Sequence, residues 1–96
     1  MNKAVITKIL KKNNLQQSKD YRGRICWEST EGFYYTRTNN SNTLDISYRR
    51  RSGSYFANQN FENRKIETLN KIVEILTAQG YIVDQTNDEV RVSKAN

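Results

Sequence analysis

The stretch from Asn60 to Val92 constrains the fold more than any other, because it reads as a long amphipathic helix, a glycine stop and a closing hairpin. Asn60 is placed to act as the N-cap of this helix, with Asn63 as the alternative cap, and Gly80 to provide the left-handed residue that ends it. A helix cannot bury its own apolar stripe, so the rest of the chain must supply a partner surface. The stripe comprises Ile66, Leu69, Val73 and Leu76, with Ile72 beside it.

That partner surface is expected to be a β-sheet. Before the long helix, apolar and polar residues alternate with a period of two, which is typical of half-buried strands. We expect antiparallel strands over residues 21–28, 33–37 and 43–49, with Leu44 and Ile46 on the face toward the helix. After Gly80, two further strands are expected, over 81–84 and 90–92.

A shorter helix is expected at the start of the chain, over residues 2–15, with Asn13 and Asn14 as its exit. Its narrow apolar stripe comprises Val5, Ile6, Ile9 and Leu10. Gly32 lies in an expected turn between two strands, where it would provide a positive φ. The elements then follow the order α-β-β-β-α-β-β. The expected fold class is α+β, with an antiparallel meander of three strands packed on one long helix.

A chain of 96 residues has room for one core, so residues 1–96 are expected to form a single α+β domain. No apolar run approaches the length of a membrane helix or of a signal-peptide core. Cys26 is the only cysteine, which excludes an internal disulfide. These features favour the cytoplasm as the location and argue against a membrane partner.

The residue inventory argues against most enzyme classes. The chain has no histidine, which removes Ser-His-Asp triads, Cys-His pairs and HExxH zinc sites. Its four glycines are scattered and form no phosphate-binding loop. Asp84, Asp88 and Glu89 lie together, but at a hairpin turn, where solvated acids are common. We therefore expect no enzyme activity, no catalytic residue, no cofactor and no metal site.

The charge is distributed unevenly along the chain. Residues 1–65 hold 13 Lys and Arg against 5 Asp and Glu, whereas residues 66–96 hold 3 against 5. The first part therefore carries a balance of +8 and the second −2, which together make the net charge of +6. This asymmetry indicates an anionic partner for the first two-thirds of the chain.

Arg49, Arg50 and Arg51 form the densest basic cluster, and the Ser-Gly-Ser sequence after them would let a loop conform to a phosphate backbone. Guanidinium groups bind phosphate oxygens bidentately. Two other interpretations stay open: a solvated helix face whose lysines complement the helix dipole, and an arginine-rich sheet face that prevents aggregation. The other candidate nucleic-acid-binding residues are Arg24, Arg37, Lys8, Lys11 and Lys12, with Tyr34 and Tyr55 as aromatic stacking partners.

Two resemblances bear on the function. The order helix, three strands, helix resembles the double-stranded-RNA-binding domain, although the turn 29–32 lacks the Pro and His of that family and the helix begins with only Arg64 and Lys65. A second set of positions is similar to small proteins carried by phages and mobile elements. These positions are Trp27-x-Ser29-x-x-Gly32-Phe33, Leu76-x-x-x-Gly80-Tyr81-x-Val83 and Val90-x-Val92.

The second resemblance implies a small accessory protein acting in a bacterial host, and some proteins of that kind are anti-CRISPR proteins. Our first hypothesis is that the chain binds DNA, RNA or a nucleoprotein complex through arginine and lysine contacts to phosphates. The alternative is an inhibitor of a host defence protein, acting through the sheet face and the loop at Tyr55 and Phe56. Exposed sheet edges would allow a homodimer with either function.

Overall fold

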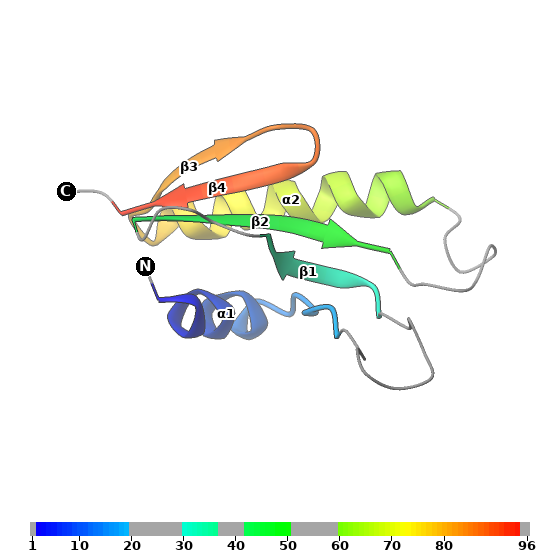
Figure 1. Ribbon diagram of the computed structural model, residues 1–96, viewed down its shortest axis with the longest axis horizontal. Helices are drawn as coiled ribbons and strands as arrows, with labels where there is room; N and C mark the ends of the chain where they lie inside the picture. The colour runs from blue at the N-terminus through cyan, green and yellow to red at the C-terminus, as the bar shows by residue number, and fades with distance from the viewer. Residues whose placement is uncertain (1, 20–29, 37–41, 51–59, 95–96) are drawn as a thin grey trace.

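The computed structural model describes residues 2–19, 30–36, 42–50 and 60–94. The described elements are α1 (Lys3–Lys12), β1 (Gly32–Tyr35), β2 (Thr43–Arg49), α2 (Phe61–Ala78), β3 (Ile82–Gln85) and β4 (Glu89–Ser93). The strands form one antiparallel sheet in the order β1-β2-β4-β3 (Figure 1). Both helices lie on the same side of this sheet, so the molecule has two layers.

Alternating side chains give the sheet one apolar face. Leu44 pairs with Val92 and Ile46 with Val90, and all four side chains are buried beneath the helices. Phe33 of β1, which is also buried, continues the same face. The expected inward direction of Leu44 and Ile46 is thus confirmed, since a period of two leaves no other register for a half-buried strand.

Helix α2 covers this face with a stripe that differs from the expected one. Leu69, Ile72 and Leu76 are buried, but Ile66 is 49% exposed, so its assignment to the core was wrong. At 100° per residue, Ile66 lies about 90° from the centre of the buried side. The inward position one turn before Leu69 belongs to Lys65, whose side chain is 12% exposed and reaches Asp88 of the β3–β4 turn.

The ends of both helices are set by residues with positive φ. Gly80 (φ 91°) ends α2 as expected, and the N–H of Tyr81 donates to the carbonyl of Leu76. Asn14 (φ 67°) ends α1 in the same way, with the N–H of Leu15 donating to the carbonyl of Leu10. These are Schellman motifs, in which an apolar residue after the helix folds back onto its last turn.

At the other end of α2, Asn60 occupies the expected N-cap position but does not cap through its side chain. Its backbone is left-handed, with φ 59°, and its side chain makes no capping hydrogen bond. A side-chain cap requires an extended backbone, as Asn2 shows at α1, where φ is −95° and the side chain accepts from the N–H of Ala4.

Gly32 has a role that the sequence pattern did not predict. Its φ lies outside the left-handed region, so the expected turn conformation was wrong. Residues 16–18 instead run parallel to β1, with the N–H of Phe33 donating to Gln16 and that of Ser18 to Phe33. A Cβ on Gly32 would lie 2.6 Å from the Ser18 nitrogen, so this close approach of two backbones requires glycine.

The α+β class is confirmed, but the three-stranded meander and the order α-β-β-β-α-β-β differ from the structure in detail. The expected strand over 21–28 lies outside the described residues. Among the described strands, β2 has β1 and β4 as neighbours, so the closing hairpin joins the sheet. This arrangement follows from burial, because Val90 and Val92 complete the apolar face beside Ile46 and Leu44. Within the described residues, neither helix is long and apolar enough to cross a membrane.

Candidate nucleic-acid interface

The lysines of α1 lie on the side of the helix that faces away from the core. Ile6 and Leu10 are fully buried and fix the orientation of the helix. Val5 is 46% exposed, so its assignment to the same stripe was wrong, because 100° per residue places it about 120° from the centre of the buried side. With 3.6 residues per turn, Lys8, Lys11 and Lys12 fall within about 60° of the direction opposite Ile6 and Leu10. All three lysines are exposed, and Lys8 and Lys12 are one turn apart. Packing of the apolar stripe therefore presents three ammonium groups together; we call them the α1 lysine face.

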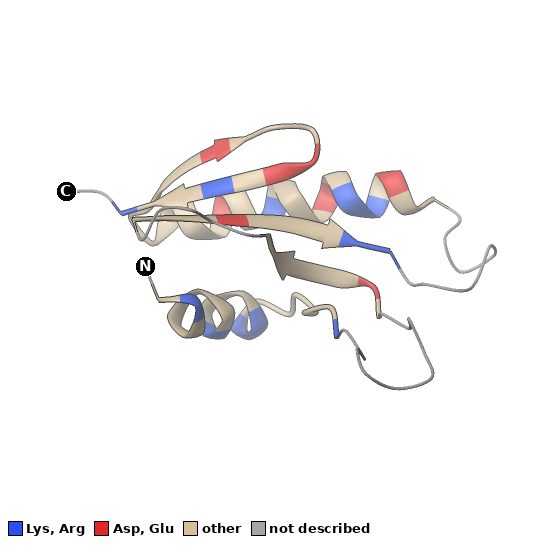
Figure 2. Cartoon of the chain, viewed as in Figure 1, with Lys and Arg blue, Asp and Glu red and all other residues tan. Residues whose placement is uncertain are grey.

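The α1 lysine face has no acidic neighbour in its own segment. Residues 2–19 contain five lysines and no Asp or Glu, as Figure 2 shows for α1. Within the described part of the chain, Lys8, Lys11 and Lys12 form no salt bridge, and the last two lie near the negative end of the helix dipole. The positive potential of this surface is thus reduced by the dipole, and no acid among the described residues forms a salt bridge that would cancel it.

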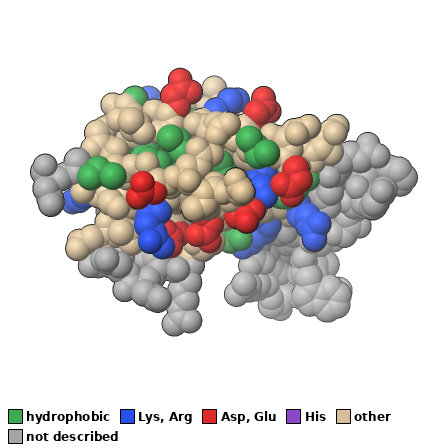
Figure 3. Space-filling view, turned by 90° about the horizontal axis from the view of Figure 1, so that it is seen from above, with side chains coloured by type: hydrophobic (Ala, Val, Ile, Leu, Met, Phe, Trp, Pro, Cys, Tyr) green, Lys and Arg blue, Asp and Glu red, His purple; other side chains and the backbone are tan. Residues whose placement is uncertain are grey.

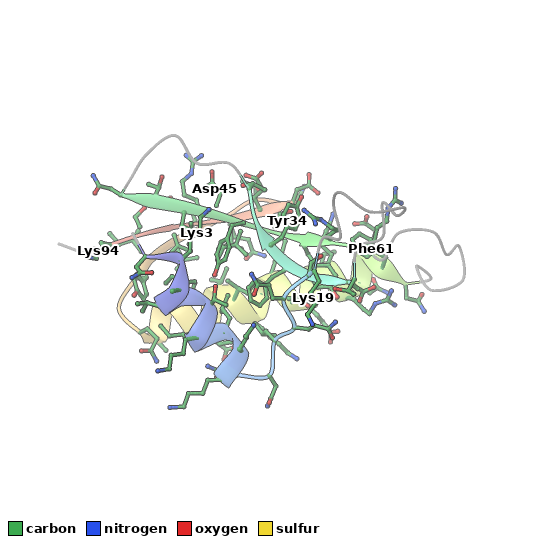
Figure 4. The ribbon with its side chains drawn as sticks, turned by 60° about the horizontal axis from the view of Figure 1, so that its bottom comes forward. Lys3, Lys19, Tyr34, Asp45, Phe61 and Lys94 are labelled. Carbon is green, nitrogen blue, oxygen red and sulfur yellow. The ribbon has the colours of Figure 1, made fainter. Side chains whose placement is uncertain are left out.

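Lys19 extends the basic surface toward β1, although the sequence patterns did not single it out. It is exposed, and its backbone exchanges hydrogen bonds with Thr30, just before β1. At this end of the sheet, Gly32 pairs with Arg49 of β2. Figure 4 labels Lys19 and shows it on the α1 and β1 side of the molecule. The absence of acids before Lys19 was the only sequence signal for it.

Arg49 and Tyr34 interact on the sheet face opposite the helices. The guanidinium carbon of Arg49 lies 4.1 Å from the centroid of the Tyr34 ring, within the range of a cation–π contact. Tyr34, a candidate stacking partner, therefore has one face of its ring already covered by arginine. Arg50 follows β2 and is exposed. The remaining candidates, Arg24, Arg37, Arg51 and Tyr55, lie outside the described residues.

Three other basic residues are paired with acids. Arg91 donates to Asp45 at 2.9 Å, and Lys65 contacts Asp88 at 2.8 Å and Glu62 at 2.9 Å. The hydrogen bond to Asp45 raises the pKa of Arg91, and the bond to Asp88 is the main cause of the raised pKa of Lys65. On the face seen in Figure 3, basic side chains accordingly lie beside acidic ones.

The third pair belongs to a half-buried network that ties Glu31, the residue before β1, to β2 and α2. Arg64 donates to both carboxylate oxygens of Glu31, at 2.7 and 2.8 Å, and the Tyr48 hydroxyl donates to the same carboxylate. The bond from Arg64 is the main cause of a lowered pKa of Glu31, while burial is the main cause of a raised pKa of Tyr48. This network fixes the end of β2, where Arg49 and Arg50 lie.

No group of three or more metal-binding side chains occurs within residues 2–19, 30–36, 42–50 and 60–94. Searches of protein-family models, curated proteins and solved structures found no match to this chain. The fold therefore defines the protein only as a two-layer α+β domain with a basic helix at one edge of its sheet.

Proposed function

We propose that this protein binds nucleic acid, or a nucleoprotein complex, through phosphate contacts centred on the α1 lysine face. The observation that carries this proposal is the contrast between exposed lysines with no acid in their segment and the acid-paired Arg64, Lys65 and Arg91. Unpaired ammonium groups retain their full attraction for phosphates, whereas a paired cation must first lose its carboxylate.

The proposed contact is backbone recognition without base readout. Ammonium groups act as mobile point charges and bind phosphate oxygens without fixing the identity of a base. Lys19 and Arg49 would extend the contact along the β1 side of the molecule. The expected ligands are DNA or RNA, and the expected location is the cytoplasm.

The test compares two variants of equal net charge. Lys8→Gln with Lys12→Gln removes two charges from the α1 lysine face, and Lys71→Gln with Lys94→Gln removes two exposed charges elsewhere; each lowers the net charge from +6 to +4. Fluorescence anisotropy with duplex DNA, single-stranded DNA and structured RNA would measure affinity at several salt concentrations. The first variant should lower affinity and flatten the logarithmic salt slope by about 0.9 per lost duplex contact.

The control variant should retain most of the wild-type affinity and slope. Equal losses in both variants would mean that only net charge attracts the nucleic acid, and the site would then be wrong. An unchanged slope in the α1 variant would remove the proposal altogether.

A second function is favoured by the charges on the sheet face away from the helices. Asp45 neutralises Arg91 there, and Ser47 is buried with its hydroxyl donating to the backbone carbonyl of Asp88. A surface with paired charges suits a protein partner better than a polyanion. We therefore keep, as the alternative, an inhibitor of a host defence protein, of the kind known among phage-borne anti-CRISPR proteins. A pull-down that survives nuclease treatment and moderate salt would support this alternative.

A further inference from the structure

The two edges of the sheet differ in how their backbone groups are satisfied. At the β1 edge, Phe33 directs its N–H and C=O outward, and residues 16–18 bind both groups. The opposite edge is β3 (Figure 1), and no described residue pairs with its outer side. An open edge of this kind is a template for pairing with another strand.

The hairpin hydrogen bonds identify which groups of β3 point outward. The N–H of Thr86 donates to the carbonyl of Glu89 at 2.8 Å, next to the pairing of Gln85 with Val90. Hydrogen-bonded and non-hydrogen-bonded pairs alternate along an antiparallel ladder. Val83 and Gln85 therefore direct their backbone N–H and C=O groups away from β4.

Exposed apolar side chains flank this edge on both faces of the sheet. Ile82 is 53% exposed on the outer face. On the helix side, Asn70 of α2 accepts a hydrogen bond from Gln85, and Ile66, 49% exposed, lies one turn before Asn70 on the same side of α2. The β3 segment has no proline or lysine that would prevent edge pairing.

We infer that β3 pairs antiparallel with β3 of a second copy of this chain, which joins two sheets into one of eight strands. A two-fold axis makes the two copies of β3 run antiparallel. Each outward N–H of one copy then faces an outward C=O of the other.

Self-repulsion of charge is weaker at this edge than at the β1 edge. Residues 66–94 carry a balance of only −2, with 3 Lys and Arg against 5 Asp and Glu, whereas residues 1–65 carry +8. Pairing through β3 sets the two α1 lysine faces at opposite ends of the joined sheet, since α1 lies beside β1 (Figure 1). The basic surfaces, which would repel each other most strongly, are thereby kept apart.

Asp84 selects the register of the pairing. An axis through Asp84 would set its carboxylate directly opposite its own copy, which is destabilising. An axis through Val83 separates the two carboxylates and sets Ile82 opposite Asp84 of the second copy. A strand of four residues supplies few bonds, so the dimer is expected to be weak and dependent on concentration.

Sedimentation equilibrium from tens to hundreds of micromolar tests the inference. The average mass should rise from the monomer value of 11.3 kDa toward twice that value. Ile82→Glu should weaken association at least about tenfold, because it sets a second carboxylate opposite Asp84. Ile82→Lys should strengthen it, because an ammonium group then faces that carboxylate. Val5→Glu, at a residue 46% exposed on α1, is the matched control and should leave association unchanged.

Hydrogen exchange gives a readout that does not depend on any variant. The amides of Val83 and Gln85 should become more protected as the concentration of the wild-type protein rises. A chain that stays monomeric throughout, or a dimer that forms without this protection, would overturn the inference. The first of these outcomes would leave β3 open to a strand of another protein.

Discussion

At the scale of single residues, Gly32 shows how a backbone contact can demand one residue type. In this contact, residues 16–18 run parallel to β1 and hydrogen-bond to it. They thereby connect the end of α1 to the sheet. The sequence suggested a turn glycine, because glycine before an aromatic strand usually provides a positive φ. The real requirement is space, which depends on a segment more than ten residues away.

Substitution of Gly32 by alanine should therefore destabilise the protein through overpacking. The new Cβ would lie 2.6 Å from the Ser18 nitrogen and 2.8 Å from the Gln17 carbonyl carbon, so one backbone must move. The expected cost in the free energy of unfolding is about 1–3 kcal/mol, measured by urea denaturation. The amides of Ser18 and Phe33 should lose protection from exchange in the variant, and unchanged protection at both would contradict this explanation.

Glu31 should give the stability of the protein a dependence on acid pH. Its hydrogen bond from Arg64 holds the pKa of the folded carboxylate below its ordinary value of 4.5. A group with a depressed folded pKa stabilises the fold fully above the unfolded pKa, and loses that contribution as pH falls through the folded value. Thermal melts of the wild type should therefore show a fall below pH 4.5 that is shallower in Glu31→Gln. Identical profiles would mean that the ion pair does not contribute.

At the scale of elements, both helices end in a Schellman motif. Asn14 and Gly80 both adopt positive φ, and the next residue, Leu15 or Tyr81, packs against the core. Glycine and asparagine tolerate this backbone, so both stops were readable from the sequence. The extent of α2 and the hairpin after it were predictable for the same reason, since periodicity and stop signals are local.

Gly80 allows the cost of backbone strain to be measured without a steric clash. A Cβ at this position would meet no atom within 4 Å, so a substitution costs only backbone strain. Gly80→Ala should lower the free energy of unfolding by about 1 kcal/mol, and Gly80→Asn by clearly less, because asparagine tolerates the left-handed region at Asn14. Chemical denaturation of the two variants measures the difference, and equal losses would show that strain is not the cause.

At the scale of the whole molecule, the fold converts an uneven charge distribution into two different sides. The α1 helix carries lysines without acids and lies at the β1 edge, whereas α2 and the β3–β4 hairpin carry both signs. Acids more than 30 residues away in the sequence accept hydrogen bonds from Arg64 and Arg91. Sequence position alone does not distinguish these two arginines from the others. The proposed interface and the proposed dimer edge are consequently at opposite edges of the sheet.

The candidate site was predictable only in part. The grouping of Lys8, Lys11 and Lys12 follows from helix periodicity and the positions of Ile6 and Leu10. Their relation to Lys19 and Arg49 was not readable, because it depends on how residues 16–18 approach β1. Arg24, Arg37, Arg51 and Tyr55, which lie outside the described residues, remain predictions from the sequence.

The sequence by itself determined the features that depend on neighbours within a few positions: the helices, their stops, the inward direction of Leu44 and Ile46 in β2 and the basic character of α1. Only the tertiary structure decided the sheet order, the exposure of Ile66, the need for glycine at position 32 and the pairing of each charge. The physical reason is that these features arise where distant segments share one surface. Local preferences restrict such contacts, but the contacts form only when the whole core closes.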